Sequence, residues 1–127
     1  MHKLNLVHHI IILQKNLNYF KIIITGESIM NENIKEKIEA ATFRRLLKHF
    51  QENPNIQNID LMELADFCRN CISKWYSEES SKNGISVDYD NARELVYGMP
   101  YKDWKEKHQA EQSSERIEKL NSKFHNH

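Results

Sequence analysis

From residue 34 onwards, apolar residues recur every three or four positions, and this spacing strongly constrains how the chain can fold. An α-helix turns once in about 3.6 residues, so the spacing places the apolar side chains on one face. Glu, Lys and Arg fill the positions between them. The sequence therefore predicts an amphipathic helix over about residues 34–52. Its apolar positions are Ile34, Ile38, Ala41, Phe43, Leu46, Leu47 and Phe50.

Further helices should follow at short intervals, because the 127 residues include only three Gly and two Pro to interrupt them. Asn53-Pro54-Asn55 should end the first helix. Asn58 or Asp60 should cap a second helix that runs to about residue 80. We expect one apolar stripe along it, formed by Leu61, Leu64, Ala65, Cys68, Ile72 and Trp75.

Cap and turn residues also mark helices in the last third of the chain. A turn at Gly84 should precede a third helix that begins at a Ser86 or Asp88 cap and ends at Gly98. Pro100 should open a fourth helix, because proline is tolerated in the first turn. A charged helix should then run from a Ser113 or Ser114 cap to about Phe124.

We therefore predict an all-α fold, a compact bundle of four or five short helices. Residues 30–127 should form a single helical domain with its core at about 33–124. A chain of 127 residues is long enough to bury one apolar core without disulfides or metals, and too short for two cores.

Residues 1–29 differ from the rest of the chain in composition. They hold only four of its 36 charged residues, and they contain two β-branched runs, Ile10-Ile11-Ile12 and Ile22-Ile23-Ile24-Thr25. We interpret the segment as upstream sequence translated before a natural start at Met30, since the codons of Gly26-Glu27 can spell a purine-rich ribosome-binding element. A β-prone hairpin or disordered tail is the second interpretation, and a targeting signal is the third.

The charges balance, with 18 Lys and Arg against 18 Asp and Glu. A chain without net charge does not attract nucleic acid or anionic lipid as a whole, so we expect at most a weak nucleic-acid contact. That contact would use the basic strip of Arg44, Arg45 and Lys48. No run approaches the ~20 apolar residues that cross a bilayer, and the small number of cysteines fits a reducing compartment. We therefore expect a cytoplasmic protein.

Cys68-Arg69-Asn70-Cys71 is the motif with the most chemical promise. Residues three apart lie on the same side of a helix, so the two thiols can pack, form a disulfide or share a metal. In a helix that begins about eight residues earlier, the N-terminal stabilisation of a thiolate has faded, which favours two packed and reduced side chains. A zinc or iron site would need further ligands, and His49 is a candidate.

Tyr97-Gly98-Met99-Pro100-Tyr101, followed by Trp104, forms a second cluster. Gly and Pro make a rigid corner between helices, and the aromatic rings can line a groove for a ligand or peptide. The same rings can instead close the core over Trp75 and Tyr76, which is their usual role at helical spacing. No complete catalytic set is found in the sequence, so we expect a protein without enzymatic activity.

Several motifs occur in a fixed order along the chain. They are Phe43-Arg44-Arg45, Asn58-Ile59-Asp60-Leu61-Met62, Phe67-Cys68-Arg69-Asn70-Cys71, Ser73-Lys74-Trp75-Tyr76, Ala92-Arg93-Glu94, and Val96-Tyr97-Gly98-Met99-Pro100-Tyr101 with Trp104-Lys105. Over about residues 36–112 the chain resembles the bacterial domain of unknown function 1244 family. The resemblance implies a short, all-helical protein without an assigned activity, in agreement with a Met30 start. It also implies a small residue, often glycine, where this chain has Asp66. A small residue there would permit a close approach of a partner or ligand.

On these residues we predict a small non-enzymatic binding or adaptor module, with an unidentified protein partner and no cofactor. Its recognition surface would join the Cys68–Cys71 helix to the corner at Gly98. The expected contacts are Arg69, Asn70, Lys74, Tyr97, Tyr101 and Trp104. The alternative is a thiol-redox or transition-metal protein, in which Cys68 and Cys71 cycle between dithiol and disulfide or, with His49, bind zinc or iron. A homodimer is compatible with either.

Overall fold

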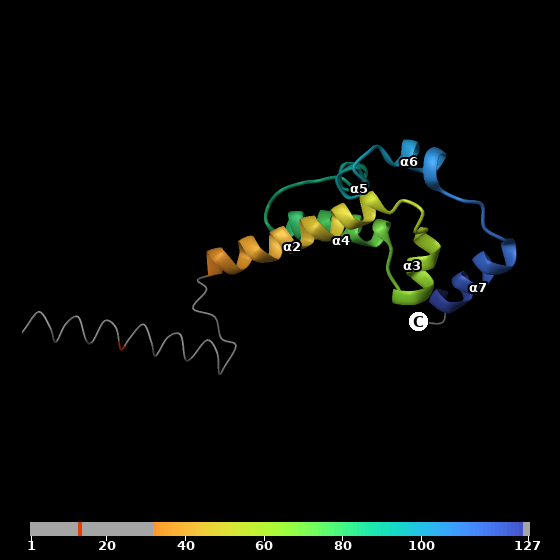
Figure 1. The fold of residues 1–127 in the computed structure, drawn as a ribbon, viewed down its shortest axis with the longest axis horizontal. Helices are drawn as coiled ribbons and strands as arrows, with labels where there is room; N and C mark the ends of the chain where they lie inside the picture. Colours follow the sequence, from red (N-terminus) through yellow and green to blue (C-terminus); the bar gives the residue numbers. More distant parts are fainter. Residues whose placement is uncertain (1–12, 14–31, 126–127) are drawn as a thin grey trace, which may run out of the picture. The chain divides into compact units, whose positions relative to one another are not determined.

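The computed structural model describes Leu13 and residues 32–125 of the chain. Residues 32–125 contain six helices, α2 (Glu32–Glu52), α3 (Asn58–Ala65), α4 (Arg69–Lys82), α5 (Tyr89–Tyr97), α6 (Tyr101–His108) and α7 (Ser114–His125) (Figure 1). These residues include no β-strand, so the predicted all-α class is confirmed. The three interpretations of residues 1–29 concern a segment outside the described residues, with Leu13 as the one exception.

The chain divides into two units, Met1–Thr42 and Phe43–His127, and α2 contributes residues to each. In the described part of the first unit, the side chains of Ile34 and Ile38 are exposed. In the second unit, α2 buries Leu47 and Phe50. The apolar face expected along the whole of α2 is thus buried over its C-terminal part. Periodicity identifies the apolar face of a helix, but not the length over which that face is covered.

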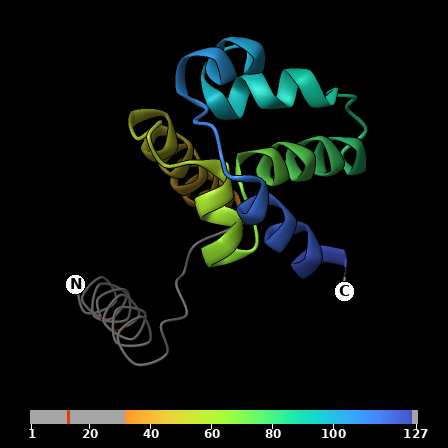
Figure 2. The same cartoon turned by 90° about the vertical axis from the view of Figure 1, so that its right-hand side faces the viewer.

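The core of the second unit lies where α4, α5 and α6 meet the end of α2. α4 packs against α5, α5 against α6, and α3 against α7. Figure 2 shows α4 and α5 as neighbouring helices joined by the loop of residues 83–88, with α7 beside α3. The buried apolar cluster consists of Leu47, Phe50, Ile72, Val96, Tyr97 and Trp104. None of the helices in the described residues is long and apolar enough to cross a membrane.

Four of the predicted helix boundaries are confirmed. The carboxylate of Asp88 caps α5 by accepting a hydrogen bond from the backbone N–H of Asn91 at 2.8 Å. Gly98 ends that helix in the left-handed conformation, with φ of 72°. Pro100 immediately precedes α6, and the hydroxyl of Ser113 accepts a hydrogen bond from the first turn of α7. Each of these residues acts through local backbone chemistry, which explains why the sequence was sufficient to find it.

The single helix expected from residue 58 to about 80 is two helices, and this part of the prediction is wrong. α3 ends at Asp66, which has φ of 59° and ψ of 21° and donates its N–H to the carbonyl of Met62 at 3.2 Å. Cys68 is extended and caps α4. The expected stripe is broken as a result, and Leu64 and Trp75 remain 89% and 50% exposed.

The conformation of Asp66 also gives a reason for the small residue that the family resemblance implies there. Its φ lies in the left-handed region, which glycine adopts without steric cost and which Asp tolerates better than most residues. The backbone conformation is therefore a sufficient reason for a small residue at this position. Neither Gly nor Pro marks the turn in this chain, so apolar spacing alone suggested a continuous helix.

A pair of substitutions at Asp66 tests this backbone conformation. Asp66→Gly and Asp66→Ala both remove the carboxylate that pairs with Lys123 at 2.5 Å, so their difference isolates the left-handed backbone. We expect the Gly variant to be more stable than the Ala variant by about 1 kcal/mol, because a Cβ is disfavoured at positive φ. Urea unfolding of both proteins measures the difference. Equal unfolding free energies would show that residue 66 is not left-handed.

Candidate functional site

Arg69, the first residue of α4, has its guanidinium buried in the core with 0% exposure. Nη1 donates to the carbonyl of Ile56 at 2.6 Å and to Oδ1 of Asn58 at 3.2 Å. Nη2 donates to the carbonyls of Phe50 at 3.3 Å and Asn53 at 3.1 Å. The planar donor fork of arginine thereby ties the segment between α2 and α3 to the start of α4.

Two aromatic rings lie against this cation. The guanidinium carbon lies 5.2 Å from the ring centroid of Phe50 and 5.0 Å from that of Trp104. Among the described residues, no Asp or Glu forms an ion pair with Arg69. Burial lowers the pKa of the guanidinium, which nevertheless stays charged because its ordinary pKa is far above neutral. Arg69 therefore organises the interior, and its burial does not fit the expected surface contact with a partner.

A chain of hydrogen bonds connects Arg69 with three other side chains. Asn58, which accepts from Arg69, donates from Nδ2 to the hydroxyl of Tyr97 at 2.9 Å. That hydroxyl donates to Oδ1 of Asn70 at 2.8 Å. Burial raises the pKa of Tyr97, so its phenol stays protonated and able to donate. This series of hydrogen bonds occupies the side-chain carbonyl oxygen of Asn70 and fixes the direction of its amide nitrogen.

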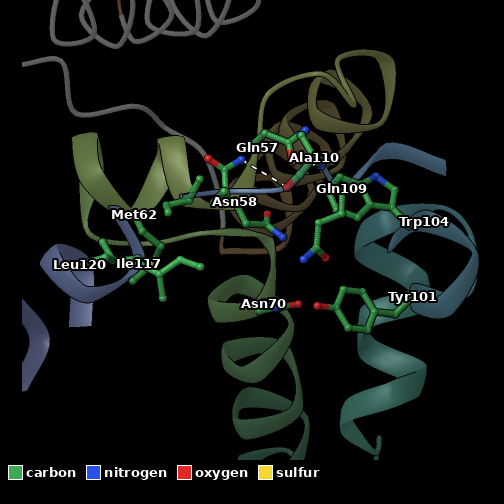
Figure 3. Close-up of a pocket in the computed structure, with 12 residues that line it drawn as sticks. Gln57, Asn58, Met62, Asn70, Tyr101, Trp104, Gln109, Ala110, Ile117 and Leu120 are labelled. Carbon is green, nitrogen blue, oxygen red and sulfur yellow. Dashed lines mark hydrogen bonds between the residues drawn. The ribbon is translucent and has the colours of Figure 1, made fainter. Parts of the chain in front are cut away.

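A pocket of about 280 Å³ lies beside Asn70, between α3, the start of α4, α6 and α7 (Figure 3). Figure 3 shows the ends of the Asn70 and Tyr101 side chains pointing toward one another. Charged residues make up 28% of the chain, yet none of the lining residues is Asp, Glu, Lys, Arg or His. The lining residues are Gln57, Asn58, Ile59, Met62, Asn70, Tyr101, Trp104, Gln109, Ala110, Gln112, Ile117 and Leu120.

Five of the lining side chains are amides, and they differ in whether they form hydrogen bonds within the protein. Gln57 holds the segment after α6, since its Nε2 donates to the carbonyl of His108 and its Oε1 accepts from the N–H of Ala110, both at 2.9 Å. Other polar groups at the pocket form no hydrogen bond with another described residue. Among them are Nδ2 of Asn70, the amide of Gln109 and the hydroxyl of Tyr101.

α7 completes the pocket and is held on α3 by Arg116. Its Nη2 lies 2.7 Å from Oδ1 of Asp60, and its Nε lies 2.7 Å from Oε1 of Glu63. A second bond from Nη2 to Oε2 of Glu63, at 2.8 Å, makes the contact with Glu63 bidentate. These hydrogen bonds lower the pKa of both carboxyl groups. The clamp therefore fixes the helix that brings Ile117 and Leu120 to the pocket wall.

The two cysteines lie at the N-terminus of α4, and not within a longer helix as predicted. Cys68 is the N-cap and Cys71 belongs to the first turn, with the two Sγ atoms 4.0 Å apart. Cys68 is 7% exposed and Cys71 is half-buried. Burial raises the pKa of Cys68, while the backbone N–H groups of Cys71 and Asn70 act in the opposite direction. Both thiols are free.

His49 does not join the two cysteines in a metal site. The residues that the structure describes include no group of three or more His, Cys, Asp or Glu side chains placed to hold a metal ion. His49 is exposed on α2, where its ring lies beside that of Phe50 with 6.2 Å between the centroids.

The other residues predicted to contact a partner do not form one exposed surface. Tyr97 and Trp104 are each 2% exposed and belong to the core, so a surface contact through them does not fit their burial. Trp104 nevertheless forms part of the pocket wall, together with Asn70 and Tyr101. Lys74 lies apart from the pocket, exposed and 4.0 Å from Glu78.

The basic strip on α2 is exposed. Arg44, Arg45 and Lys48 are all accessible to solvent, and Lys48 pairs with Glu52 at 3.7 Å. This arrangement agrees with a solvated helix face.

Sequence reasoning missed the amides of Gln57, Gln109 and Gln112 and the apolar wall formed by Met62, Ile117 and Leu120. Asn58 was expected only as a helix cap. These residues come from separate segments and meet only through the packing of α3, α6 and α7. A weak signal was present in the two uncharged glutamines between α6 and α7, within a stretch otherwise rich in charge.

Comparison with known families gives one result. The model of the family described as "Protein of unknown function (DUF1244)" matches residues 56–122. This chain belongs to the DUF1244 family. The match confirms the resemblance and covers just over half of the chain. Every pocket residue and both cysteines of this DUF1244 protein lie within the matched residues. A search of curated proteins found no match.

The Arg116 clamp of this DUF1244 protein predicts a specific dependence of stability on pH. Because the folded state lowers the pKa of Asp60 and Glu63, the unfolded state binds more protons as the pH falls through their ordinary range near 4. The stabilisation is therefore present at neutral pH, begins to be lost below about pH 5 and disappears as the pH falls through the lowered folded-state pKa of each carboxyl group. We expect Arg116→Gln to lower the melting temperature at pH 7 and to have a progressively smaller effect as the pH is lowered below about 4.

Melting curves recorded across this pH range, for the wild type and the variant, measure the effect. Arg45→Gln is the matched control, since it removes one exposed positive charge from a residue without an ion pair among the described residues. A constant difference between wild type and Arg116→Gln at all pH values would contradict the clamp.

Proposed function

We propose that this protein is a non-enzymatic binding module whose pocket at Asn70, Tyr101 and Trp104 takes a short uncharged segment of a partner protein. The observation that carries the proposal is the composition of the pocket lining, which combines amides with apolar side chains and has no ionisable acid or base other than the phenol of Tyr101. A site of this composition imposes a desolvation cost on a charged ligand without offering a counter-charge. It favours a neutral one.

The volume of the pocket indicates how much of a partner it can hold. Small-molecule and cofactor sites usually measure about 300–1,000 Å³, and this pocket, at about 280 Å³, lies just below that range. It fits one or two side chains better than a complete cofactor. The apolar wall of Ile59, Met62, Ile117 and Leu120 suits an aliphatic side chain.

The unused polar groups suggest which hydrogen bonds the partner makes. Nδ2 of Asn70 donates only, the Gln109 amide donates and accepts, and the hydroxyl of Tyr101 does both. A peptide amide, or the side chain of Asn or Gln, satisfies such a set. The expected ligand is therefore a peptide segment that pairs an aliphatic residue with an amide-bearing one.

Titration of the isotope-labelled protein with short capped peptides tests this proposal by NMR. We expect a capped Leu-Gln peptide to shift the side-chain amide signals of Asn70 and Gln109, with a dissociation constant on the order of 1 mM, which is about 4 kcal/mol of binding free energy. A peptide with Glu or Lys in place of Gln should bind at least about ten-fold more weakly, because the pocket offers its charge no partner.

Two variants separate the pocket from the rest of the surface. Asn70→Asp keeps the oxygen that accepts from Tyr97 but loses both amide donors and gains a charge, so we expect it to abolish binding. Lys74→Ala, on the same helix but outside the pocket, should leave binding unchanged. Equal binding by neutral and charged peptides, or loss of binding in Lys74→Ala alone, would contradict the proposal.

A further inference from the structure

The N-terminus of α4 brings two thiols together at a distance suited to disulfide formation. The Sγ atoms of Cys68 and Cys71 are 4.0 Å apart in the reduced protein, against about 2.05 Å in a disulfide. Cys68 is in the extended cap position, with φ of −143° and ψ of −177°, and so lies outside the rigid helical turn. Forming the bond therefore requires the two sulfur atoms to approach one another by about 2 Å.

The two thiols differ in their access to solvent. Cys71 is half-buried, whereas Cys68 is 7% exposed. An external reagent therefore reaches Cys71 first. Cys68 is placed to react with Cys71, because no other thiol exists in the chain. Burial also raises the pKa of Cys68, which disfavours its thiolate and slows its direct reaction with external reagents.

We propose that Cys68 and Cys71 form a redox-active dithiol, in which Cys71 exchanges with an external disulfide and Cys68 then closes an intramolecular disulfide. This inference concerns the pair at the start of α4 and does not rest on the peptide-binding proposal. A low-molecular-weight disulfide, for which oxidised glutathione is the probe, supplies the oxidising equivalents.

The reaction consists of two balanced thiol–disulfide exchanges. The Cys71 thiolate attacks one sulfur of oxidised glutathione, forms a mixed disulfide and releases one glutathione thiolate. Cys68 gives its proton to solvent, and its thiolate attacks Sγ of Cys71, which forms the Cys68–Cys71 bond and releases the second glutathione thiolate. The protein loses two protons and two electrons, and one oxidised glutathione becomes two reduced glutathione molecules once the thiolates are protonated.

Intact-mass analysis of the full chain in glutathione buffers tests the proposal. We expect oxidised glutathione to convert the wild type to a monomer that is lighter by two hydrogen atoms and has no thiol reactive toward N-ethylmaleimide. Reduced glutathione or dithiothreitol should restore both thiols. A wild type that keeps both thiols free, accumulates a stable glutathione adduct, or links two chains would overturn the proposal.

Single substitutions test the separate roles of the two sulfur atoms. Cys68→Ser should stop at the glutathione adduct, because Cys71 is still reached but no thiol remains to displace glutathione. Cys71→Ser should react with oxidised glutathione at least about ten-fold more slowly than Cys68→Ser, because the remaining thiol is buried. Equal reaction of both variants would overturn the assigned order. Circular dichroism shows whether each variant is folded. The masses of the wild type alone decide whether the Cys68–Cys71 disulfide forms, even if a variant is unfolded.

Discussion

The guanidinium of Arg69 collects oxygen atoms from Phe50, Asn53, Ile56 and Asn58 and lies against the rings of Phe50 and Trp104. A buried charge is costly unless it is surrounded by hydrogen-bond partners, and here backbone carbonyls provide most of them. The same contacts give a further donor to the carbonyl groups of Phe50 and Asn53, which also accept from the backbone N–H groups of Asn53 and Ile56, and they engage the carbonyl of Ile56. One side chain thereby fixes both the turn and the beginning of α4.

The position of Arg69 determines what lies on either side of it in the sequence. Cys68 precedes it as the helix cap, and Asn70 follows it at the edge of the pocket. The hydrogen bonds from Arg69 through Asn58 and Tyr97 then orient the Asn70 amide. Cys71 also adjoins the pocket, since its Sγ lies 4.0 Å from Sδ of Met62 in the pocket wall. The thiol pair and the pocket are therefore neighbours built on the same helix start.

The sequence predicted features that depend on local chemistry and missed those that depend on tertiary packing. Asp88, Gly98, Pro100 and Ser113 act on the backbone beside them, and their helix boundaries were predicted correctly. The turn at Asp66 was missed, because an aspartate in the left-handed conformation leaves no trace in the apolar spacing.

The burial of Arg69 could not be read from the sequence either. An arginine is ordinarily expected at the surface, and its neighbours in the sequence, Cys68 and Asn70, give no sign that this one is buried. The oxygen atoms that surround Arg69 come from residues 11 to 19 positions earlier in the chain, so their arrangement follows from the fold. The pocket is formed by segments that lie still farther apart in the sequence. Of its lining residues, only Asn70, Tyr101 and Trp104 were predicted as contacts from the sequence.

The unfolding free energy of Arg69→Lys, compared with that of Arg45→Lys, is the most direct test of the central role of Arg69. Lysine keeps the charge but cannot present the planar fork, so several buried oxygen atoms lose their donors. We predict that Arg69→Lys loses about 3 kcal/mol or more, or is unfolded without denaturant, whereas Arg45→Lys on the exposed face of α2 stays within about 0.5 kcal/mol of the wild type. An Arg69→Lys protein as stable as the wild type would contradict the account.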